Sequence, residues 1–173
     1  MVDQEGQNVI ASYLGANAKL CLEHLNNPCV THQLQGCQSI VLTDPPLDVA
    51  RQLITSAKQH RTPILWDPGI LISRGWEALQ PLAKQVDIIF LNESEAISLL
   101  GTAELGMAIE HLQELRFHNY TVLKLGAQGA VMLEPAKGMV IEVPALPLKD
   151  LGLNVINTVG CGDVFVGAFA AYR

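Results

Sequence analysis

The segment around Gly160 carries residue types that can hold a phosphate group and accept a proton. Gly160, Cys161 and Gly162 are followed directly by Asp163, where a run of small apolar residues typical of a helix begins. Glycines permit the turn that points successive N–H groups in one direction, and a helix N-terminus adds partial positive charge. This pattern predicts an anion-binding loop with Asp163 beside it as a candidate proton acceptor. The alternative is an ordinary helix-entry turn in which Asp163 only interacts with the helix dipole.

The composition indicates a folded domain with a substantial core. The chain has 173 residues, of which 49% are apolar and 16% are charged, and this combination excludes a disordered protein. The net charge of −6 provides no general attraction to nucleic acid or to anionic membranes. We see neither a membrane-spanning run nor a signal peptide, so we expect a cytoplasmic protein.

The cysteines show no metal-binding or redox spacing. No two of them form a Cys-x-x-Cys pair, which argues against a zinc site and a redox dithiol. We expect buried or half-buried free thiols. The four cysteines are Cys21, Cys29, Cys37 and Cys161.

Strand-like and helix-like stretches alternate along most of the chain, which predicts an α/β fold. Helical crossovers between such strands indicate a mainly parallel sheet covered on both faces. Strands are expected at residues 39–43, 63–67, 86–91 and 120–124, and helices at 47–60, 72–84 and 103–117. A hairpin is expected over 130–143, and a half-exposed strand over 8–13 that is broken at 15–18.

The polar residues of interest follow the predicted strands. Asp44 follows one strand, residues 92–95 follow another and residues 126–129 a third. In open parallel sheets, ligands bind outside the carboxyl ends of the strands. We therefore expect these segments and the glycine loop before the last helix to meet at one edge of the sheet.

Four segments resemble the ribokinase-type (PfkB) family of sugar kinases, in the family's order. Residues 160–163 are similar to its Gly-Ala-Gly-Asp signature, residues 91–96 to its Asn-x-x-Glu segment and residues 125–130 to its nucleotide loop. Residues 2–18 resemble its lid strand and the turn that follows. The resemblance implies a three-layer α/β/α fold, with part of a β-lid over residues 1–18 and an incomplete kinase core over 19–173.

The resemblance also implies an activity. It points to ATP-dependent phosphorylation of a sugar hydroxyl, with D-ribose, giving ribose 5-phosphate, as the first candidate; another PfkB-type kinase such as a fructokinase is an alternative. Asp163 would take the hydroxyl proton, and the N–H groups of Gly160, Cys161 and Gly162 would hold the developing anion. Asp44, together with Asp163, would contact the sugar.

By the same resemblance, Glu95 would hold Mg²⁺ through water and Asn92 would reach a nucleotide phosphate. These two residues also fit a helix capping box, and the two interpretations are compatible. ATP would lie against the nucleotide loop and the glycine loop. The residues assigned to it are Asn92, Lys124, Leu125, Gly126, Ala127, Gln128, Gly129 and Gly162.

Two of these positions have structural alternatives. Lys124, where the family often has a hydroxyl residue, would pair with a phosphate as a point charge; alternatively it is a solvated lysine at a tight turn. Asp44 stands where family members usually have a glutamate; alternatively it forms a turn before proline.

Two residues depart from the family pattern in the glycine loop. Asn157 stands where cation-using members have an acidic residue, so a K⁺ site at Asn157 and Val159 would have a carbonyl ligand but no negative charge there. Cys161 replaces an alanine. Because it lies at a predicted helix N-terminus, we expect Cys161 to be the thiol most sensitive to alkylation and to be shielded by bound nucleotide.

The chain resembles the central piece of a longer kinase. Family segments for sugar binding and for closing the adenine pocket have no counterpart in it, so we expect little or no kinase activity from these residues alone, and a homodimer formed through the lid in a full-length parent. The alternatives are a module that binds nucleotide without phosphoryl transfer and a structural remnant that associates with a partner.

Overall fold

The computed structural model describes residues 13–115 and 119–172, which form a six-stranded sheet in the order β1-β2-β3-β4-β5-β6. Strands β1 to β4 are parallel, and β5 and β6 continue the sheet as an antiparallel hairpin. The predicted α/β class, the mainly parallel sheet and the hairpin are therefore confirmed. The strands are β1 (Ile40–Thr43), β2 (Ile64–Asp67), β3 (Ile88–Asn92), β4 (Tyr120–Lys124), β5 (Ala130–Glu134) and β6 (Met139–Val143).

The helices that connect the parallel strands pack on one face of the sheet. Because each strand is added beside the previous one, right-handed crossovers place all of their helices on that face. Ile54, Leu82 and Leu112 from these helices share one apolar core with Trp66 and Leu91 from the strands. The helices are α3 (Leu47–His60), α4 (Trp76–Ala83), α5 (Glu93–Leu100) and α6 (Leu105–Glu114).

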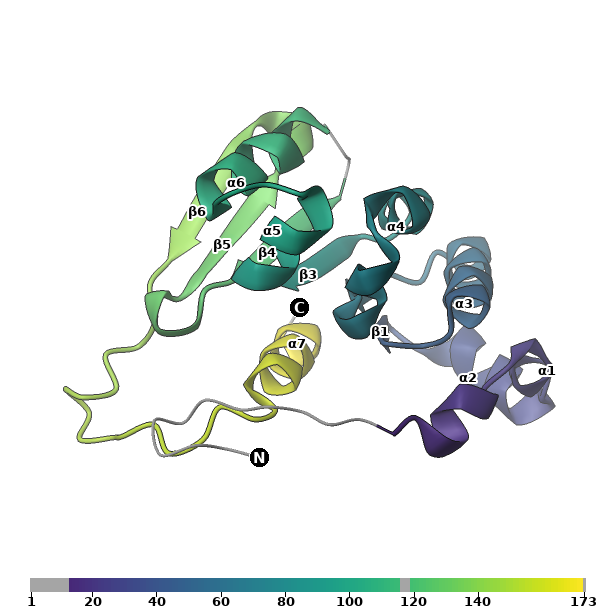
Figure 1. Ribbon diagram of the computed structural model, residues 1–173. Helices are drawn as coiled ribbons and strands as arrows, with labels where there is room; N and C mark the ends of the chain where they lie inside the picture. Colours follow the sequence, from purple (N-terminus) through teal and green to yellow (C-terminus); the bar gives the residue numbers. More distant parts are fainter. Residues whose placement is uncertain (1–12, 116–118, 173) are drawn as a thin grey trace.

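Helix α7 (Cys161–Ala171) covers the opposite face of the sheet and completes three layers. Its Val166 is 2% exposed and packs with Leu65 of β2. Phe90 of β3 makes edge-to-face contacts with two rings of α7, at centroid distances of 6.3 Å to Phe165 and 5.3 Å to Phe169. A long connection leaves β6, runs away from the sheet and returns to α7 (Figure 1). The aromatic contacts thus fix α7 against the sheet.

The region predicted as one helix over residues 72–84 forms two elements. A 3₁₀ helix, η2 (Gly69–Arg74), ends at Gly75, and α4 begins after it. Gly75 has φ +81°, a left-handed conformation that interrupts helical hydrogen bonding. The sequence periodicity continues through this break, which is why a single helix is predicted.

Two helices precede β1 where the sequence predicts none. They are α1 (Leu22–Leu25) and α2 (Pro28–Gly36), and both pack against α3 at the end of the sheet opposite the hairpin (Figure 1). Asn27 caps α2 by accepting the Cys29 N–H at 2.9 Å, and Pro28 is the first helical residue. This Asn-Pro pair is a recognisable helix start.

Residues 8–12 of the predicted strand and the lid strand over residues 2–6 lie outside the described part of the chain, and so does the predicted helix end at Phe117. Tyr13, the last residue of the predicted strand, is described and does not lie in a strand. Residues 15–19 form a 3₁₀ helix, η1 (Gly15–Lys19). No helix among the described residues combines the length and apolar character needed to cross a bilayer.

The prediction that the thiols are buried or half-buried is wrong for two cysteines. Cys21 and Cys37 are half-buried, whereas Cys29 and Cys161 are exposed. Cys29 lies in the first turn of α2, which has no buried residue, and Cys161 opens α7 at its solvent-facing end.

Candidate functional site

The four parallel strands end together, and each end carries a polar side chain. Asp67 is the last residue of β2 and lies opposite Thr43, the last residue of β1. Asp44 follows Thr43 directly in the sequence. Asn92 and Lys124 are the last residues of β3 and β4 and are register partners. Parallel strands bring their carboxyl ends to one edge, as predicted from the sequence.

Lys124 pairs with Asp67 across the end of β3. The distance from Nζ to Oδ2 is 2.5 Å, and the side chains are only 14% and 12% exposed, respectively. The alternative of a solvated lysine is therefore wrong. Asp67 was not predicted as a site residue, although an acidic residue at a strand end before Pro68-Gly69 is the same signal that marked Asp44.

The first turn of α7 lies against the Lys124 ammonium. A Cβ built on Gly162 would lie 3.5 Å from Lys124 Nζ. Gly160 caps the helix in a left-handed conformation, with φ +79°, and its carbonyl accepts the Val164 N–H at 2.9 Å. The helix N-terminus and the ammonium thus bring two sources of positive charge to one place.

Asp44 binds the loop that follows β2. Its Oδ1 accepts the Ile70 N–H at 2.6 Å, and its own φ of +48° is a left-handed conformation that is uncommon outside glycine. A Cβ on Gly69 would collide with the Asp44 carboxyl, so this contact requires glycine at position 69. The side-chain partner lies 26 positions along the chain, so a local turn before proline does not account for this contact, and the contact of Asp44 with a sugar stays a prediction.

The pKa of Asp44 links this residue to the glycine loop. Burial raises the pKa of Asp44 above 3.8, the Ile70 N–H lowers it, and the negative charges of Asp67 and Asp163 raise it further. Asp163, which is exposed in the first turn of α7, is therefore near enough to Asp44 for their charges to interact. The predicted proton acceptor and the predicted sugar contact therefore lie in the same part of the molecule, and their joint role in a site stays a prediction.

Asn92 and Glu95 form the predicted capping box at the start of α5. Asn92 Oδ1 accepts the Glu95 N–H at 2.8 Å, and Glu95 Oε2 accepts the Asn92 N–H at 2.7 Å. Burial raises the pKa of Glu95 above 4.5, and the hydrogen bond from the Asn92 N–H lowers it. The negative charges of Asp67 and Asp44 also raise this pKa, whereas the positive charge of Lys124 lowers it. The helix-cap interpretation is confirmed, and the contacts of these two residues with Mg²⁺ and phosphate stay predictions.

The predicted nucleotide loop is a tight turn between β4 and β5. Leu125 N–H donates to the Gly129 carbonyl at 2.8 Å around the short 3₁₀ helix η3 (Gly126–Gln128). Gly129 has φ +100°, and a Cβ there would collide with the Val143 carbonyl and the Ala145 backbone nitrogen. Ala127 and Gln128 are exposed, and their contact with a nucleotide stays a prediction.

Asn157 closes a turn just before α7. Its Oδ1 accepts the Val159 N–H at 2.8 Å, an Asx turn that uses the carbonyl oxygen assigned to a monovalent cation. The cation site at these two residues stays a prediction. In the described part of the chain, no group of three or more His, Cys, Asp or Glu residues is arranged to hold a metal ion.

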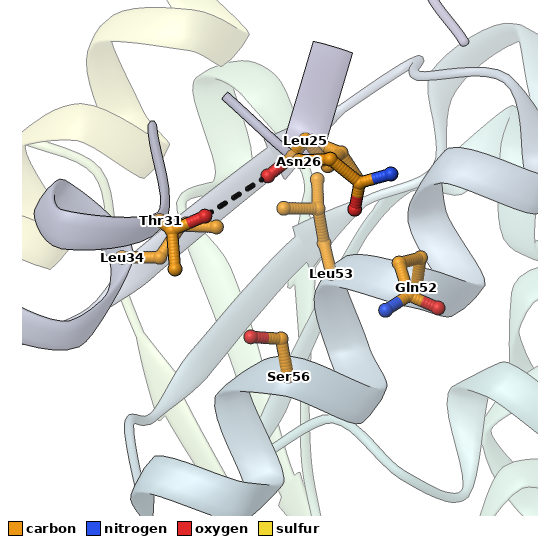
Figure 2. A pocket seen from close by; sticks show the side chains of 7 residues that line it. All are labelled: Leu25, Asn26, Thr31, Leu34, Gln52, Leu53 and Ser56. Atoms are coloured by element: carbon orange, nitrogen blue, oxygen red, sulfur yellow. Dashed lines mark hydrogen bonds between the residues drawn. The ribbon is translucent and has the colours of Figure 1, made fainter. Parts of the chain in front are cut away.

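A small cavity lies away from this edge, between α1, α2 and α3 (Figure 2). Its volume of about 160 Å³ is below the roughly 300–1,000 Å³ of typical ligand sites. Thr31 Oγ1 donates to the Leu25 carbonyl at its rim. The lining includes no charged residue and consists of Leu25, Asn26, Thr31, Leu34, Gln52, Leu53 and Ser56. We therefore place the candidate site at the edge of the sheet.

Comparison with known proteins gives one matching family model, described as pfkB family carbohydrate kinase, over residues 1–173. Mouse ribokinase is 31% identical over 99% of this chain and 52% of its own length. Deoxyribokinase of Salmonella typhi is 27% identical over 99% of this chain and 54% of its own length. Cytidine kinase of Thermococcus kodakarensis is 30% identical over 55% of this chain and 32% of its own length. The chain spans about half the length of the ribokinase and the deoxyribokinase.

Solved structures show the same fold. Ribokinase from Giardia lamblia superimposes with a TM-score of 0.80 at 20% identity, over 98% of this chain and 53% of that one. Arabidopsis thaliana ribokinase, solved with ribose and ATP, gives a TM-score of 0.66 at 22% identity, over 83% of this chain and 45% of that one. Adenosine kinase from Anopheles gambiae gives a TM-score of 0.75 at 22% identity, over 88% of this chain and 49% of that one.

Proposed function

This chain belongs to the pfkB family of carbohydrate kinases, and we propose that it carries the phosphoryl-transfer site of an ATP-dependent kinase that acts on the hydroxyl of a sugar or nucleoside. One observation carries the proposal: the N-terminus of α7, with Asp163 in its first turn, lies against the Lys124 ammonium at the edge where the parallel strands end. An anion-binding helix end beside a carboxylate suits the attack of a hydroxyl on a phosphate.

In the proposed reaction, the terminal phosphate of ATP binds at the first turn of α7. The substrate hydroxyl oxygen forms a bond to the γ-phosphorus while the bond from that phosphorus to the bridging β,γ-oxygen breaks, and Asp163 takes the hydroxyl proton. The N–H groups of Gly160 and Gly162 stabilise the charge that develops on the transferred group, and the Cys161 N–H, which donates to the Thr158 carbonyl at 3.2 Å in the structure, would exchange that partner for the phosphate. Positioning and charge provide most of the rate enhancement in such reactions.

The residues at the sheet edge suit magnesium held through water. Glu95 offers a carboxylate oxygen, the ligand type that Mg²⁺ prefers, and because Mg²⁺ keeps several of its waters, one protein carboxylate together with the nucleotide phosphates suits it. A bound Mg²⁺ would neutralise charge on the nucleotide phosphates. We assign Glu95 as the carboxylate that faces it, because its capping hydrogen bond occupies only Oε2.

D-ribose is the first candidate substrate. The mouse ribokinase matches nearly the whole chain, whereas the cytidine kinase matches 55% of it. The deoxyribokinase match makes 2-deoxyribose the second candidate. We also propose a cytoplasmic location. A panel of ribose, 2-deoxyribose, fructose and cytidine at equal concentration distinguishes these substrates.

The test combines nucleotide binding with phosphoryl transfer. MgATP is titrated by calorimetry, and transfer of radiolabelled γ-phosphate to each acceptor is followed under single-turnover conditions, which detect slow reactions. Binding and transfer to ribose support the proposal. Binding without transfer to any acceptor supports the alternative of a nucleotide-binding module, and the absence of both contradicts the proposed function.

A further inference from the structure

Lys124 reaches its partner by crossing one strand of the sheet. It ends β4, whereas Asp67 ends β2, and β3 lies between them. Strands that are second neighbours lie about 10 Å apart, so the lysine stem must extend over the end of β3 to make its 2.5 Å contact. The contact determines where the ammonium lies.

That position is beside the first turn of α7. The ammonium lies near the Cα of Gly162, where a built Cβ would approach Nζ to 3.5 Å. A cation beside the positive end of a helix dipole is unfavourable unless negative charge accompanies it. Asp67 supplies one negative charge in the structure. A phosphate at the helix end would supply more.

The ammonium can bind Asp67 and a phosphate together. A protonated lysine has three hydrogen-bond donors, and the contact with Asp67 uses one of them. The Asp67 side chain is only 12% exposed, so its carboxylate holds the ammonium in a largely buried setting where charge interactions are stronger. Lys124 also lies close enough to Glu95 to lower the pKa of that carboxyl.

We propose that Asp67 is a positioning residue: it holds the Lys124 ammonium across the end of β3 so that the ammonium binds the terminal phosphates of the nucleotide at the N-terminus of α7. This inference rests on the proposed function and adds a residue that the sequence motifs did not include. Asp67 acts only through Lys124.

The simpler electrostatic view makes the opposite prediction. Asp67 is negatively charged, so its removal alone would reduce repulsion of a phosphate and tighten nucleotide binding. If Asp67 positions Lys124, its removal instead weakens binding because the ammonium is no longer held at the helix end. The sign of the change therefore distinguishes the two views.

The experiment measures MgATP and AMP affinity by calorimetry for the wild-type protein and the variants Asp67→Asn, Lys124→Met, Lys124→Arg and Asp67→Asn/Lys124→Met. Lys124→Met should weaken MgATP binding by about tenfold or more, as for the loss of a charge-assisted hydrogen bond, and leave AMP affinity unchanged. Lys124→Arg, which keeps the positive charge, should weaken MgATP binding by less than Lys124→Met does. Asp67→Asn should weaken MgATP binding, but should cause no further weakening in the Lys124→Met background.

Two controls accompany these variants. Lys149→Met removes an exposed lysine from the connection after β6 and should leave MgATP affinity unchanged. Thermal unfolding shows which variants are folded. The double variant removes both charges and so avoids leaving one of them unpaired in a largely buried setting. If wild-type protein does not bind MgATP, the proposed function fails and this inference fails with it. If wild-type protein binds MgATP but Asp67→Asn binds it equally or more tightly, the inference alone is overturned.

Discussion

Asn92 and Glu95 hold each other through two reciprocal hydrogen bonds, of 2.8 Å and 2.7 Å, at the junction of β3 and α5. The pair fixes the Glu95 carboxylate at the sheet edge, where burial and the charges of Asp67 and Asp44 raise its pKa. The helix cap thus holds the Glu95 carboxyl where its ionisation carries an electrostatic cost. Such costs are typical of functional sites, where perturbed carboxylates gather.

Glu95→Gln tests that cost. Because the pKa of Glu95 is higher in the folded than in the unfolded protein, ionisation of Glu95 destabilises the fold as the pH rises through the folded-state pKa. Glutamine keeps an oxygen to accept the Asn92 N–H and cannot ionise. We expect the variant to be more stable than wild type at about pH 7, and the difference to vanish below about pH 4, where both side chains are neutral.

Denaturant unfolding across this pH range provides the measurement, and Glu110→Gln, at an exposed position on α6, provides the matched control. The control should show no comparable pH-dependent gain. A Glu95→Gln variant that is less stable than wild type by the same amount at every pH would contradict the expectation.

Gly129 and Gly126 both have positive φ in the same loop, but only Gly129 lies against another segment. Gly129→Ala should cost about 3 kcal/mol of unfolding free energy or more, because a strained conformation is combined with a collision against Val143 and Ala145. Gly126→Ala should cost about 1–2 kcal/mol from its conformation alone. Urea unfolding compares the two, and equal losses would show that the close backbone approach at Gly129 is not required.

Cys161 and Cys29 are both exposed, which makes Cys29 an internal control for labelling. If a nucleotide phosphate binds at the first turn of α7, it shields Cys161 and leaves Cys29 accessible. At an MgATP concentration about ten times its Kd, free protein falls to about a tenth, so alkylation of Cys161 should slow about tenfold. Mass spectrometry after timed N-ethylmaleimide treatment measures both thiols. Equal rates at Cys161 with and without MgATP would place the nucleotide elsewhere.

The sequence predicts the sheet well because its buried strands are short apolar runs with clear ends. It predicts helix 72–84 incorrectly, because the left-handed conformation of Gly75 leaves no mark on the apolar spacing. Helix α2 has no buried residue, so it lacks the apolar stripe by which helices are recognised, although Asn27-Pro28 signals its start.

The candidate site likewise contains residues that the sequence predicts and residues that it misses. The glycine loop, Asp44 and the Asn92–Glu95 pair are visible as motifs, whereas the Lys124–Asp67 pair joins residues 57 positions apart and requires the strand order. An aspartate at the end of a strand indicates a position at the sheet edge, but its partner comes from the tertiary structure.

Asp163→Asn tests most directly whether this edge of the sheet performs phosphoryl transfer. Loss of the proton acceptor should reduce the slow single-turnover transfer of γ-phosphate to ribose that we expect of this chain by about 10²–10⁴-fold, while MgATP still binds, because the N–H groups of the loop remain. Asp150→Asn, at an exposed position in the connection before α7, should transfer at the wild-type rate. An Asp163→Asn protein that transfers phosphate as fast as wild type would contradict the assignment of Asp163 as the base.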